Sequence, residues 1–316
     1  MHGATRSVRI PTLIALVSCA ITPIILRGQP PQIELVGQLP SVLSESSGIA
    51  VSRANPGVLW THNDSDNDPI LYAIDITGEL LGTFALESAT MRDWEDMSLG
   101  PCVDDHTAHC LYVADTGDNM RQRSVYTVYI VVEPVVSPGI GVDPTTVGPV
   151  GRLDFRYPGA PHDAEALAVT PGGDIYIVTK GWEGTARVFR ITRDVVEHAV
   201  KNGATITASA VEGLTIETGT TPFLITGAAM SPSGNTMVAR TYLGLHFFDM
   251  NQEGGFEARE QPCMIGYREP QGEAVDFLDE STLVLTSESL SGRPGTIHRV
   301  KCEGAEGAGG AEGAAA

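Results

Sequence analysis

One short pattern occurs five times along the chain, and it restricts the possible fold more than any other feature. Each copy begins with polar or acidic residues, continues through small apolar residues and is followed by turns and apolar strands. The copies read Glu45-Ser-Ser-Gly-Ile-Ala, Asp93-Trp-Glu-Asp-Met, Asp163-Ala-Glu-Ala-Leu, Thr226-Gly-Ala-Ala-Met and Gln271-Gly-Glu-Ala-Val. Equivalent positions lie 48, 70, 61 and 47 residues apart. Repeats of this length built from short strands are typical of a β-propeller, so the sequence predicts an all-β fold with one blade per copy.

The number of blades follows from the strands within each repeat. The first three repeats each contain four predicted strands, whereas the last contains only three. Residues 33–38, ahead of the first repeat, form a predicted strand that belongs to no blade. A closed propeller would use this strand to complete the last blade, which leaves no long edge exposed. We therefore predict five blades closed by the N-terminal strand, with six possible if one of the two longer intervals contains a degenerate blade.

The third repeat and the two ends of the chain carry further predictions. Residues 205–211 are predicted to form the outer strand of the third repeat, after a short helix that begins at the capping residue Asp194 and stops at Gly203. The propeller domain is expected to span residues 29–302. Residues 303–316 contain only Gly, Ala and Glu, which cannot form a core, so we predict a disordered tail.

The first 28 residues are typical of an export signal. Arg6 and Arg9 precede an apolar run over residues 10–17 that ends in small residues. Residues 16–19, Leu-Val-Ser-Cys, resemble a bacterial lipobox, in which Cys19 would be lipidated. Apolar residues continue to Leu26, where a lipoprotein usually becomes polar, so ordinary signal-peptidase cleavage and an uncleaved anchor are the alternatives. All three alternatives predict a secreted or cell-envelope protein, periplasmic or lipid-anchored, that meets a membrane only through its N-terminal lipid or anchor.

The remaining four cysteines support export, because an oxidising compartment favours disulfides. Cys102 and Cys110 flank a short loop between two predicted strands of one repeat, and Cys263 and Cys302 lie in the last two repeats. Four cysteines allow three connectivities. Of these we predict the bonds Cys102–Cys110 and Cys263–Cys302.

The negative net charge of the chain makes some classes of binding partner unlikely. The 39 acidic residues outnumber the 20 basic ones, which gives a net charge of −19. Binding to phosphate groups needs positive charge, so nucleic acid is not an expected partner. The acidic excess serves solubility in many proteins, and it is also compatible with cationic ligands such as divalent metals.

A propeller brings the repeated polar residues together, because the innermost strand of each blade lines the central channel. The inner column of the alignment holds Ser47, Glu95, Glu165, Thr226 and Glu273, and the outer column holds Glu45, Asp93, Asp163, Leu224 and Gln271. Residues at the end of each second strand should face the same mouth of the channel. They are His62, Asn63, Asp64, Asp115, Asp118, Asn119, Lys180, Arg240 and Glu288. We predict that this mouth binds a ligand.

Several carboxylates near one axis repel each other unless they are protonated, paired with Lys180 and Arg240, or neutralised by a bound cation. Carboxylate oxygens suit calcium best and magnesium less well. The residues predicted to bind a divalent cation, with calcium favoured, are Glu45, Glu95, Asp115, Glu165 and Glu273. The alternative is a water-filled channel whose hydrogen-bonded carboxylates cap the inner strands and hold the blades together.

The sequence assigns no catalytic residue. It contains no Gly-x-Ser-x-Gly nucleophile motif, although carboxylates with separated pKa values could act as general acid and base. His62 and His162 are the best histidine candidates for proton transfer. The three tryptophans beside the motifs could pack the blades or stack on a ring-shaped substrate; they are Trp60, Trp94 and Trp182.

Several of these motifs together resemble a group of secreted bacterial propeller proteins of uncharacterised function. They are Glu45-Ser-Ser-Gly-Ile-Ala, Trp60-Thr-His-Asn-Asp-Ser, Asp93-Trp-Glu-Asp, Asp115-Thr-Gly-Asp-Asn with Arg123, and Glu133-Pro134. The resemblance covers about residues 41–300, and a more distant one extends to TolB-like, gluconolactonase-type and esterase-like phytase propellers, which are commonly six-bladed. Lactonase-type relatives hold a divalent metal in the channel through Glu, Asn and Asp. By position, the five predicted metal ligands are their counterparts here.

Two functions follow as expectations. The first is a binding or scaffold module that takes a small molecule, a carbohydrate or an envelope protein. The second is a divalent-metal-dependent hydrolase of an ester, lactone or phosphoester. The first is favoured, because no nucleophile is evident and no catalytic residue of the resembling families can be matched.

Overall fold

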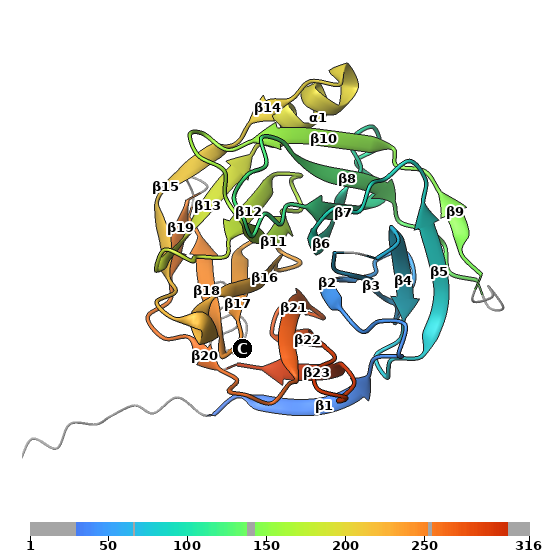
Figure 1. Ribbon diagram of the computed structural model, residues 1–316, viewed down its shortest axis with the longest axis vertical. Coiled ribbons are helices and arrows are strands. Elements are labelled where there is room, and N and C mark those ends of the chain that lie inside the picture. The colour runs from blue at the N-terminus through green and yellow to red at the C-terminus, as the bar shows by residue number, and fades with distance from the viewer. Residues whose placement is uncertain (1–29, 66, 138–142, 252–254, 303–316) are drawn as a thin grey trace, which may run out of the picture.

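The computed structural model describes residues 30–65, 67–137, 143–251 and 255–302. Five β-sheets are arranged around a central axis, with the innermost strand of each sheet next to that axis (Figure 1). The predicted five-bladed propeller is confirmed, and no sixth sheet occurs among the described residues. The predicted export signal, Cys19 and the predicted disordered tail lie outside these residues. No helix in the described ranges is long and apolar enough to span a bilayer.

Blades one and two each consist of four antiparallel strands and one added strand at the outer edge. Blade one contains β2 (Ser46–Val51), β3 (Leu59–Asn63), β4 (Ile70–Ile74), β5 (Leu80–Leu86) and the added β9 (Thr145–Val147). Blade two contains β6 (Trp94–Pro101), β7 (His109–Asp115), β8 (Tyr126–Val132), β10 (Gly151–Arg156) and the added β14 (Ile206–Thr207). Both added strands run parallel to the strands with which they pair. In the chain, β9 follows β8 of blade two and β14 follows β13 of blade three, so each added strand returns to the preceding blade. They cover outer edges that would otherwise expose unpaired backbone groups.

Blades three and four are less regular at their outer edges. Blade three contains β11 (Ala164–Val169), β12 (Ile175–Thr179), β13 (Thr185–Ile191) and β15 (Ser209–Glu217). Blade four contains β16 (Ile225–Met230), β17 (Thr236–Thr241) and β18 (Gly244–Met250), and two short strands, β19 (Phe256–Ala258) and β20 (Cys263–Met264), pair with β18. A 3₁₀ turn, η1 (Thr221–Phe223), connects the two blades.

Two predictions for the third repeat need correction. The predicted outer strand over residues 205–211 is divided: β14 joins blade two, and only β15 completes blade three. The helix is present as α1 (Arg193–Asn202) and ends at Gly203, which has the expected left-handed conformation. Its N-cap is Thr192 rather than Asp194, because Asp194 lies within the first turn, where its charge favours the helix dipole.

Blade five closes the ring as predicted. It contains β21 (Gln271–Phe277), β22 (Thr282–Glu288), β23 (Thr296–Lys301) and β1 (Gln32–Gln38). Strand β1 pairs with β23 in antiparallel register, so the first described strand forms the outer edge of the last blade (Figure 1). A disulfide between Cys263 and Cys302 joins this blade to blade four, and a second one joins Cys102 to Cys110. Both predicted disulfides are therefore confirmed.

The hydrophobic core lies in layers between neighbouring blades. Trp60 and Trp94 are fully buried in the layer between blades one and two. The ring of Phe84 lies 5.3 Å from Trp60 and that of Tyr129 lies 6.0 Å from Trp94. Burying a large side chain in this way stabilises the fold by about 2–3 kcal/mol. These two tryptophans therefore pack the blades, whereas Trp182 is half exposed.

Candidate cation site at the mouth of the channel

Each inner strand carries a β-bulge at its copy of the repeated motif. The register of all five inner strands shifts at or beside the residue of the predicted inner column. A bulge turns a side chain away from its regular direction, and bulges are frequent beside binding sites. The five side chains are buried at one end of the channel; they are Ser47, Glu95, Glu165, Thr226 and Glu273.

The two hydroxyl members of the inner column hold neighbouring blades together. Ser47 Oγ donates to the carbonyl oxygen of Glu95 at 2.5 Å, and Thr226 Oγ1 donates to the carbonyl oxygen of Glu273 at 2.8 Å. Both bonds therefore join one copy of the motif to the next copy around the ring. The acidic members are held differently: Glu165 pairs with Lys180 and Glu273 accepts a hydrogen bond from Gln271, both within their own blades, and the carboxylate of Glu95 accepts no hydrogen bond from the described residues.

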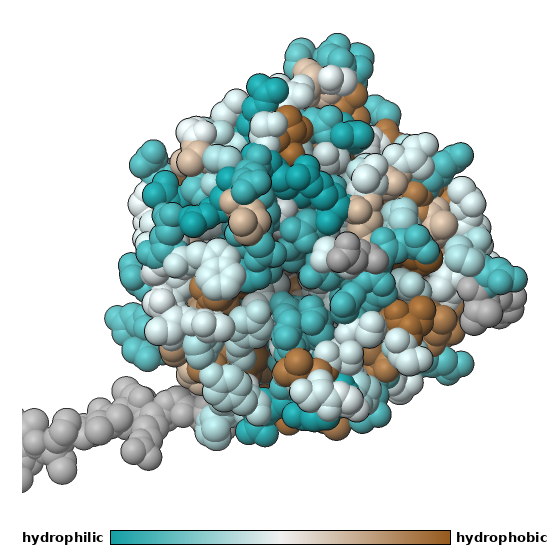
Figure 2. All heavy atoms as spheres, in the orientation of Figure 1, coloured by the Kyte–Doolittle hydropathy of each residue, from teal (hydrophilic) through white to brown (hydrophobic). Residues whose placement is uncertain are grey.

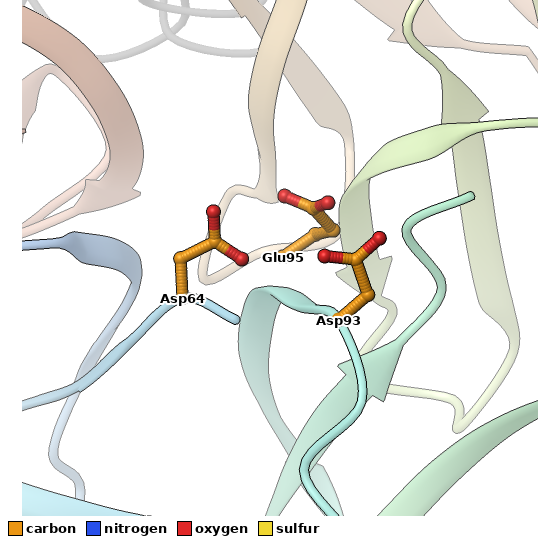
Figure 3. A group of neighbouring side chains, drawn as sticks. All are labelled: Asp64, Asp93 and Glu95. Atoms are coloured by element: carbon orange, nitrogen blue, oxygen red, sulfur yellow. The ribbon is translucent and has the colours of Figure 1, made fainter. Parts of the chain in front are cut away.

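Two groups of three carboxylates lie close enough to share an ion. One group consists of Asp64, Asp93 and Glu95 (Figure 3), and the other of Glu95, Asp163 and Glu165. Within each group the nearest ligand oxygens lie within 4.8 Å of one another. Glu95 belongs to both groups and is only 4% exposed. The surface around the propeller axis is mostly hydrophilic (Figure 2).

The second group already has internal partners. Lys180 Nζ lies 2.7 Å from Glu165 Oε1, as expected for one of the two predicted cationic partners. The carboxylate of Asp163 accepts hydrogen bonds from the backbone N–H of Asp118 at 2.7 Å and from Trp182 Nε1 at 2.8 Å. Two of the three carboxylates in this group, Asp163 and Glu165, therefore already have partners within the protein.

The first group, Asp64, Asp93 and Glu95, has almost no hydrogen-bonding partners within the protein. Among the described residues, no donor forms a hydrogen bond to the carboxylate of Asp93 or Glu95. Asp64 accepts only the backbone N–H of the next residue, Ser65, at 2.5 Å. Burial penalises the charged form of Glu95, and the nearby charge of Lys180, which is bonded to Glu165, offsets that cost only in part. Asp64, Asp93 and Glu95 thus present their oxygens to a position where a cation would remove that cost.

The pKa values of these carboxyl groups are raised. Burial raises the pKa of Asp93 to about 6, with further contributions from the charges of Asp64 and Asp163. Burial and the neighbouring carboxylates Glu165 and Asp64 raise the pKa of Glu95 well above its usual value. Burial also raises the pKa of Glu165 to about 7, although Lys180 opposes the shift. Without a cation, these carboxyl groups therefore hold their protons to higher pH than exposed carboxyl groups do, because burial and mutual repulsion outweigh the effect of the basic residues nearby.

Glu45, Glu273 and Glu288 lie at the same mouth but outside both carboxylate groups. Gln271 Nε2 donates to Glu273 Oε1 at 2.9 Å and to Glu288 Oε2 at 2.8 Å, so the amide bridges the two side chains. Burial and the charges of Asp64 and Glu45 raise the pKa of Glu288 to about 8. Glu45 accepts a hydrogen bond from Asn67 at 2.5 Å near the surface. Of the five predicted metal ligands, only Glu95 and Glu165 lie in a group that could share one ion.

Asp115, Asp118 and Asn119 build the loop beside the site. Asp115 Oδ1 is 2.8 Å from Arg123 Nη1 and also accepts the backbone N–H of Asp93 at 3.2 Å, so this pair positions Asp93. Asp118 accepts hydrogen bonds from two backbone N–H groups of the same loop and from a tyrosine hydroxyl. Asn119 is exposed. Asp115 and Asp118 thus hold the loop, whereas Asp64 and Asp93 lie in the group of three carboxylates with Glu95.

His62 and Asn63 lie behind the mouth rather than in it. His62 is fully buried, edge-on against Trp94 at 5.5 Å, and its Nδ1 donates to the carbonyl oxygen of Asn63 at 2.8 Å. Burial lowers the pKa of His62 to about 4, so the ring is neutral near pH 7. The side chain of Asn63 accepts the backbone N–H of Glu45 and donates to the carbonyl of Val42.

The predicted pairing of Arg240 with the channel carboxylates is wrong. Arg240 is fully buried, donates to the carbonyl oxygens of Ala274 and Thr286, and forms an ion pair with Glu269. It therefore joins blade four to blade five. Glu269 lies in a loop without any repeated pattern, and for this reason the sequence did not identify it as the partner.

Asp96 is the residue that the motif contained and the site prediction omitted. Its Oδ2 accepts the backbone N–H groups of Leu167 at 2.8 Å and Ala228 at 3.1 Å, and its Oδ1 accepts that of Met97 at 2.8 Å. The carboxyl group is fully buried, and it links the inner strands of blades two, three and four across the axis. Asp96 thus holds three blades together through its hydrogen bonds, as the alternative of structural carboxylates expects of such a residue.

Comparison with known proteins supports the fold. No known family matches the sequence, and no curated protein is significantly similar to it. Among solved structures, the PQQ-bound form of aldose sugar dehydrogenase from Streptomyces coelicolor is similar, with a TM-score of 0.50 and 12% identity over 86% of this chain and 98% of that chain. The Dos1 propeller also matches, with a TM-score of 0.38 and 14% identity over 80% of this chain and 57% of that chain. At these identities the similarity concerns the fold alone, and the resemblance to particular propeller families stays a prediction.

Proposed function

We propose that this protein is a ligand-binding propeller of the cell envelope whose acidic channel mouth holds a divalent cation, with calcium favoured over magnesium. The observation that carries the proposal is Glu95, a buried carboxylate that accepts no hydrogen bond from the described residues and lies beside Asp64 and Asp93. Three carboxylates offer up to six oxygens in an uneven arrangement. Calcium accepts such flexible sets of oxygen ligands, whereas magnesium demands near-octahedral geometry and keeps several waters.

The two disulfides support the location, because such bonds persist in oxidising compartments outside the cytoplasm. The acidic surface supports the cationic ligand, since charge at the mouth raises the local concentration of cations. A bound cation would in turn orient the oxygen atoms of a larger ligand above the mouth. The propeller then acts as a rigid support whose loops select that ligand.

The test is a calorimetric titration of the purified protein with calcium and with magnesium. We expect about one calcium ion per chain, and a loss of affinity of at least about tenfold in Glu95→Gln, since this change removes a buried ligand charge. The control variant Glu212→Gln also removes one carboxylate charge, but from an exposed position on β15, and it should bind calcium with the affinity of the original protein. The proposal fails if the original protein binds no stoichiometric divalent ion, or if both variants lose affinity equally.

A cation-dependent hydrolase is the second candidate. It is favoured by Glu165, which lies beside the proposed cation ligands without being one of them and whose pKa burial raises to about 7 in the absence of a cation, because a carboxyl group of this kind can accept and donate protons near neutral pH. A bound cation would polarise the substrate or its attacking water. The test is calcium-dependent hydrolysis of an ester, a lactone and a phosphodiester, with Glu165→Gln expected to lower turnover while calcium binding persists. If none of the three substrates is hydrolysed, the hydrolase is refuted and only the binding function remains.

A further inference from the structure

A pocket of about 270 Å³ opens beside the acidic mouth, between blades four and five. Three segments form it: η1, the turn between β17 and β18, and the loop that leads into β21. Its main lining residues are Thr221, Pro222, Tyr242, Tyr267, Pro270 and Gln271. Two of them reach the mouth. Gln271 bridges Glu273 and Glu288, and the hydroxyl of Tyr242 lies within the electrostatic influence of the same two carboxyl groups.

The walls of this pocket are mostly apolar and partly aromatic. The ring of Tyr267 is 76% exposed, so its burial contributes little to the fold. Tyr242 is half buried, and Pro222 and Pro270 complete the apolar surface. An exposed aromatic ring at the edge of a concave apolar surface is typical of a binding site, because the ring offers a large rigid contact area at a low cost in conformational entropy.

The polar groups in the pocket carry no free charge. Glu269, the charged residue in the lining, is neutralised by Arg240. Burial and the charge of Glu273 raise the pKa of the Tyr242 hydroxyl, so it is a neutral hydrogen-bond donor. The amide of Gln271 still has its carbonyl oxygen as an acceptor. The adjoining mouth is negative and repels anions, so the pocket suits an uncharged ligand with one apolar face and several hydroxyl groups.

We propose that this pocket binds a neutral pyranose sugar, with the C–H face of the ring on Tyr267 and hydroxyl groups hydrogen-bonded to Tyr242 and Gln271. The volume suits a ligand of this size, since pockets for larger, drug-sized molecules span roughly 300–1,000 Å³. The sugar touches none of Asp64, Asp93 and Glu95. The inference therefore stands apart from the cation site, and each can fail without the other.

The test uses methyl glycosides of glucose, galactose and mannose, with binding measured by saturation-transfer NMR and by calorimetry, in the presence and absence of calcium. At least one glycoside should bind and should receive the strongest saturation on the protons of one ring face. Tyr267→Ala should weaken that affinity by about tenfold, whereas Tyr267→Phe should retain it because the ring remains. Leu35→Ala, which removes an exposed apolar side chain from β1, should have no effect.

Three results would overturn the inference: no binding of any of the three glycosides, equal affinity of Tyr267→Ala and the original protein, or equal affinity for a neutral glycoside and the corresponding anionic glucuronide. The saturation pattern of the original protein tests the stacked ring face without any substitution. Calcium titration of Tyr267→Ala checks that the variant is folded and that the cation site is separate. Sugar binding without calcium binding would overturn the proposed cation site and leave the sugar pocket in place.

Discussion

Gly117 lies directly against the carboxylate of Glu95. A Cβ atom at this position would overlap Oε1 of Glu95 and would lie 2.5 Å from Oδ2 of Asp93, so only glycine allows both carboxylates to occupy their present positions. The backbone of Gly117 is not in the left-handed region, and the reason for glycine is therefore space rather than conformation. The loop from β7 to β8 thus makes room for the carboxylates of the proposed cation site.

We predict that Gly117→Ala weakens calcium binding by about tenfold to a hundredfold, because the added methyl group displaces the carboxylates of Glu95 and Asp93. Gly148→Ala is the matched control, since a Cβ atom there meets no other atom within 4 Å. Calorimetric titration of both variants checks the prediction. Unchanged calcium affinity in Gly117→Ala would contradict a site at these two carboxylates.

Calcium binding at pH 7 should release on the order of one proton per ion, because a cation stabilises the charged form of neighbouring carboxyl groups. Without the cation, the pKa values of Asp93, Glu165 and Glu288 are about 6, 7 and 8, so these groups hold protons near neutrality. Calorimetry in two buffers of different ionisation enthalpy measures the release. Calcium affinity should also increase from pH 6 to pH 8. An affinity that is constant over this range would refute the prediction.

The same carboxyl groups predict how stability depends on pH without calcium. Their raised pKa values mean that the folded protein holds more protons than the unfolded chain between about pH 4.5 and pH 8. Their contribution to the free energy of unfolding is thus complete below this range and decreases as the pH rises through it. Saturating calcium should remove most of that decrease, as urea denaturation with and without the ion can show.

The effect of His62 on the pH dependence of stability should be opposite to that of the carboxyl groups. Its pKa is lowered by burial from 6.5 to about 4, so the unfolded chain binds the additional proton between these values. The stabilising contribution is complete above pH 6.5 and is lost as the pH falls towards 4, by roughly 3 kcal/mol. His62→Phe keeps a ring against Trp94 and cannot titrate, so its unfolding free energy should fall less on acidification. His198→Gln, an exposed helix position, is the control, and identical pH profiles for His62→Phe and the original protein would disprove this role.

The two disulfides should differ in their contribution to stability. Cys263 and Cys302 are 39 residues apart, whereas Cys102 and Cys110 are 8 residues apart. In the chain-entropy view a longer closed loop restricts the unfolded state more, by about 1 kcal/mol for these two lengths. Replacing Cys263 and Cys302 by serine should therefore lower the unfolding free energy by about 1 kcal/mol more than replacing the other pair. Urea denaturation of the two double variants tests this, and an equal or reversed order would contradict it.

Features that repeat in the sequence were predictable, and features that depend on single long-range contacts were not. The spacing of the motif predicted five blades, and the unpartnered strand over residues 33–38 predicted the closure by β1. Strand β9 was missed and β14 was assigned to the wrong blade, because each joins a blade other than the one its position in the chain suggests. Parallel pairing of two or three residues leaves no pattern in the sequence.

The candidate site shows the same division. Alignment of the copies placed Glu95, Glu165 and Asp163 at one mouth, and the structure brings them together. The alignment could not show that Arg240 would pair with Glu269, or that Asp115 would be bound by Arg123, because those partners lie in loops outside the repeat. The members of the ring differ for a physical reason: the hydroxyl groups of Ser47 and Thr226 join neighbouring blades, whereas the three acidic side chains make no bond to the next blade.

The carboxyl group of Asp96 has a consequence for the geometry of the carboxylates next to it. Asp96 accepts backbone N–H groups from blades two, three and four and is inaccessible to solvent, so it fixes the inner strands of these blades relative to one another. Two of these strands, β6 and β11, carry Glu95 and Glu165. The separation of these two carboxylates therefore depends on a buried side chain that no ligand at the mouth can touch.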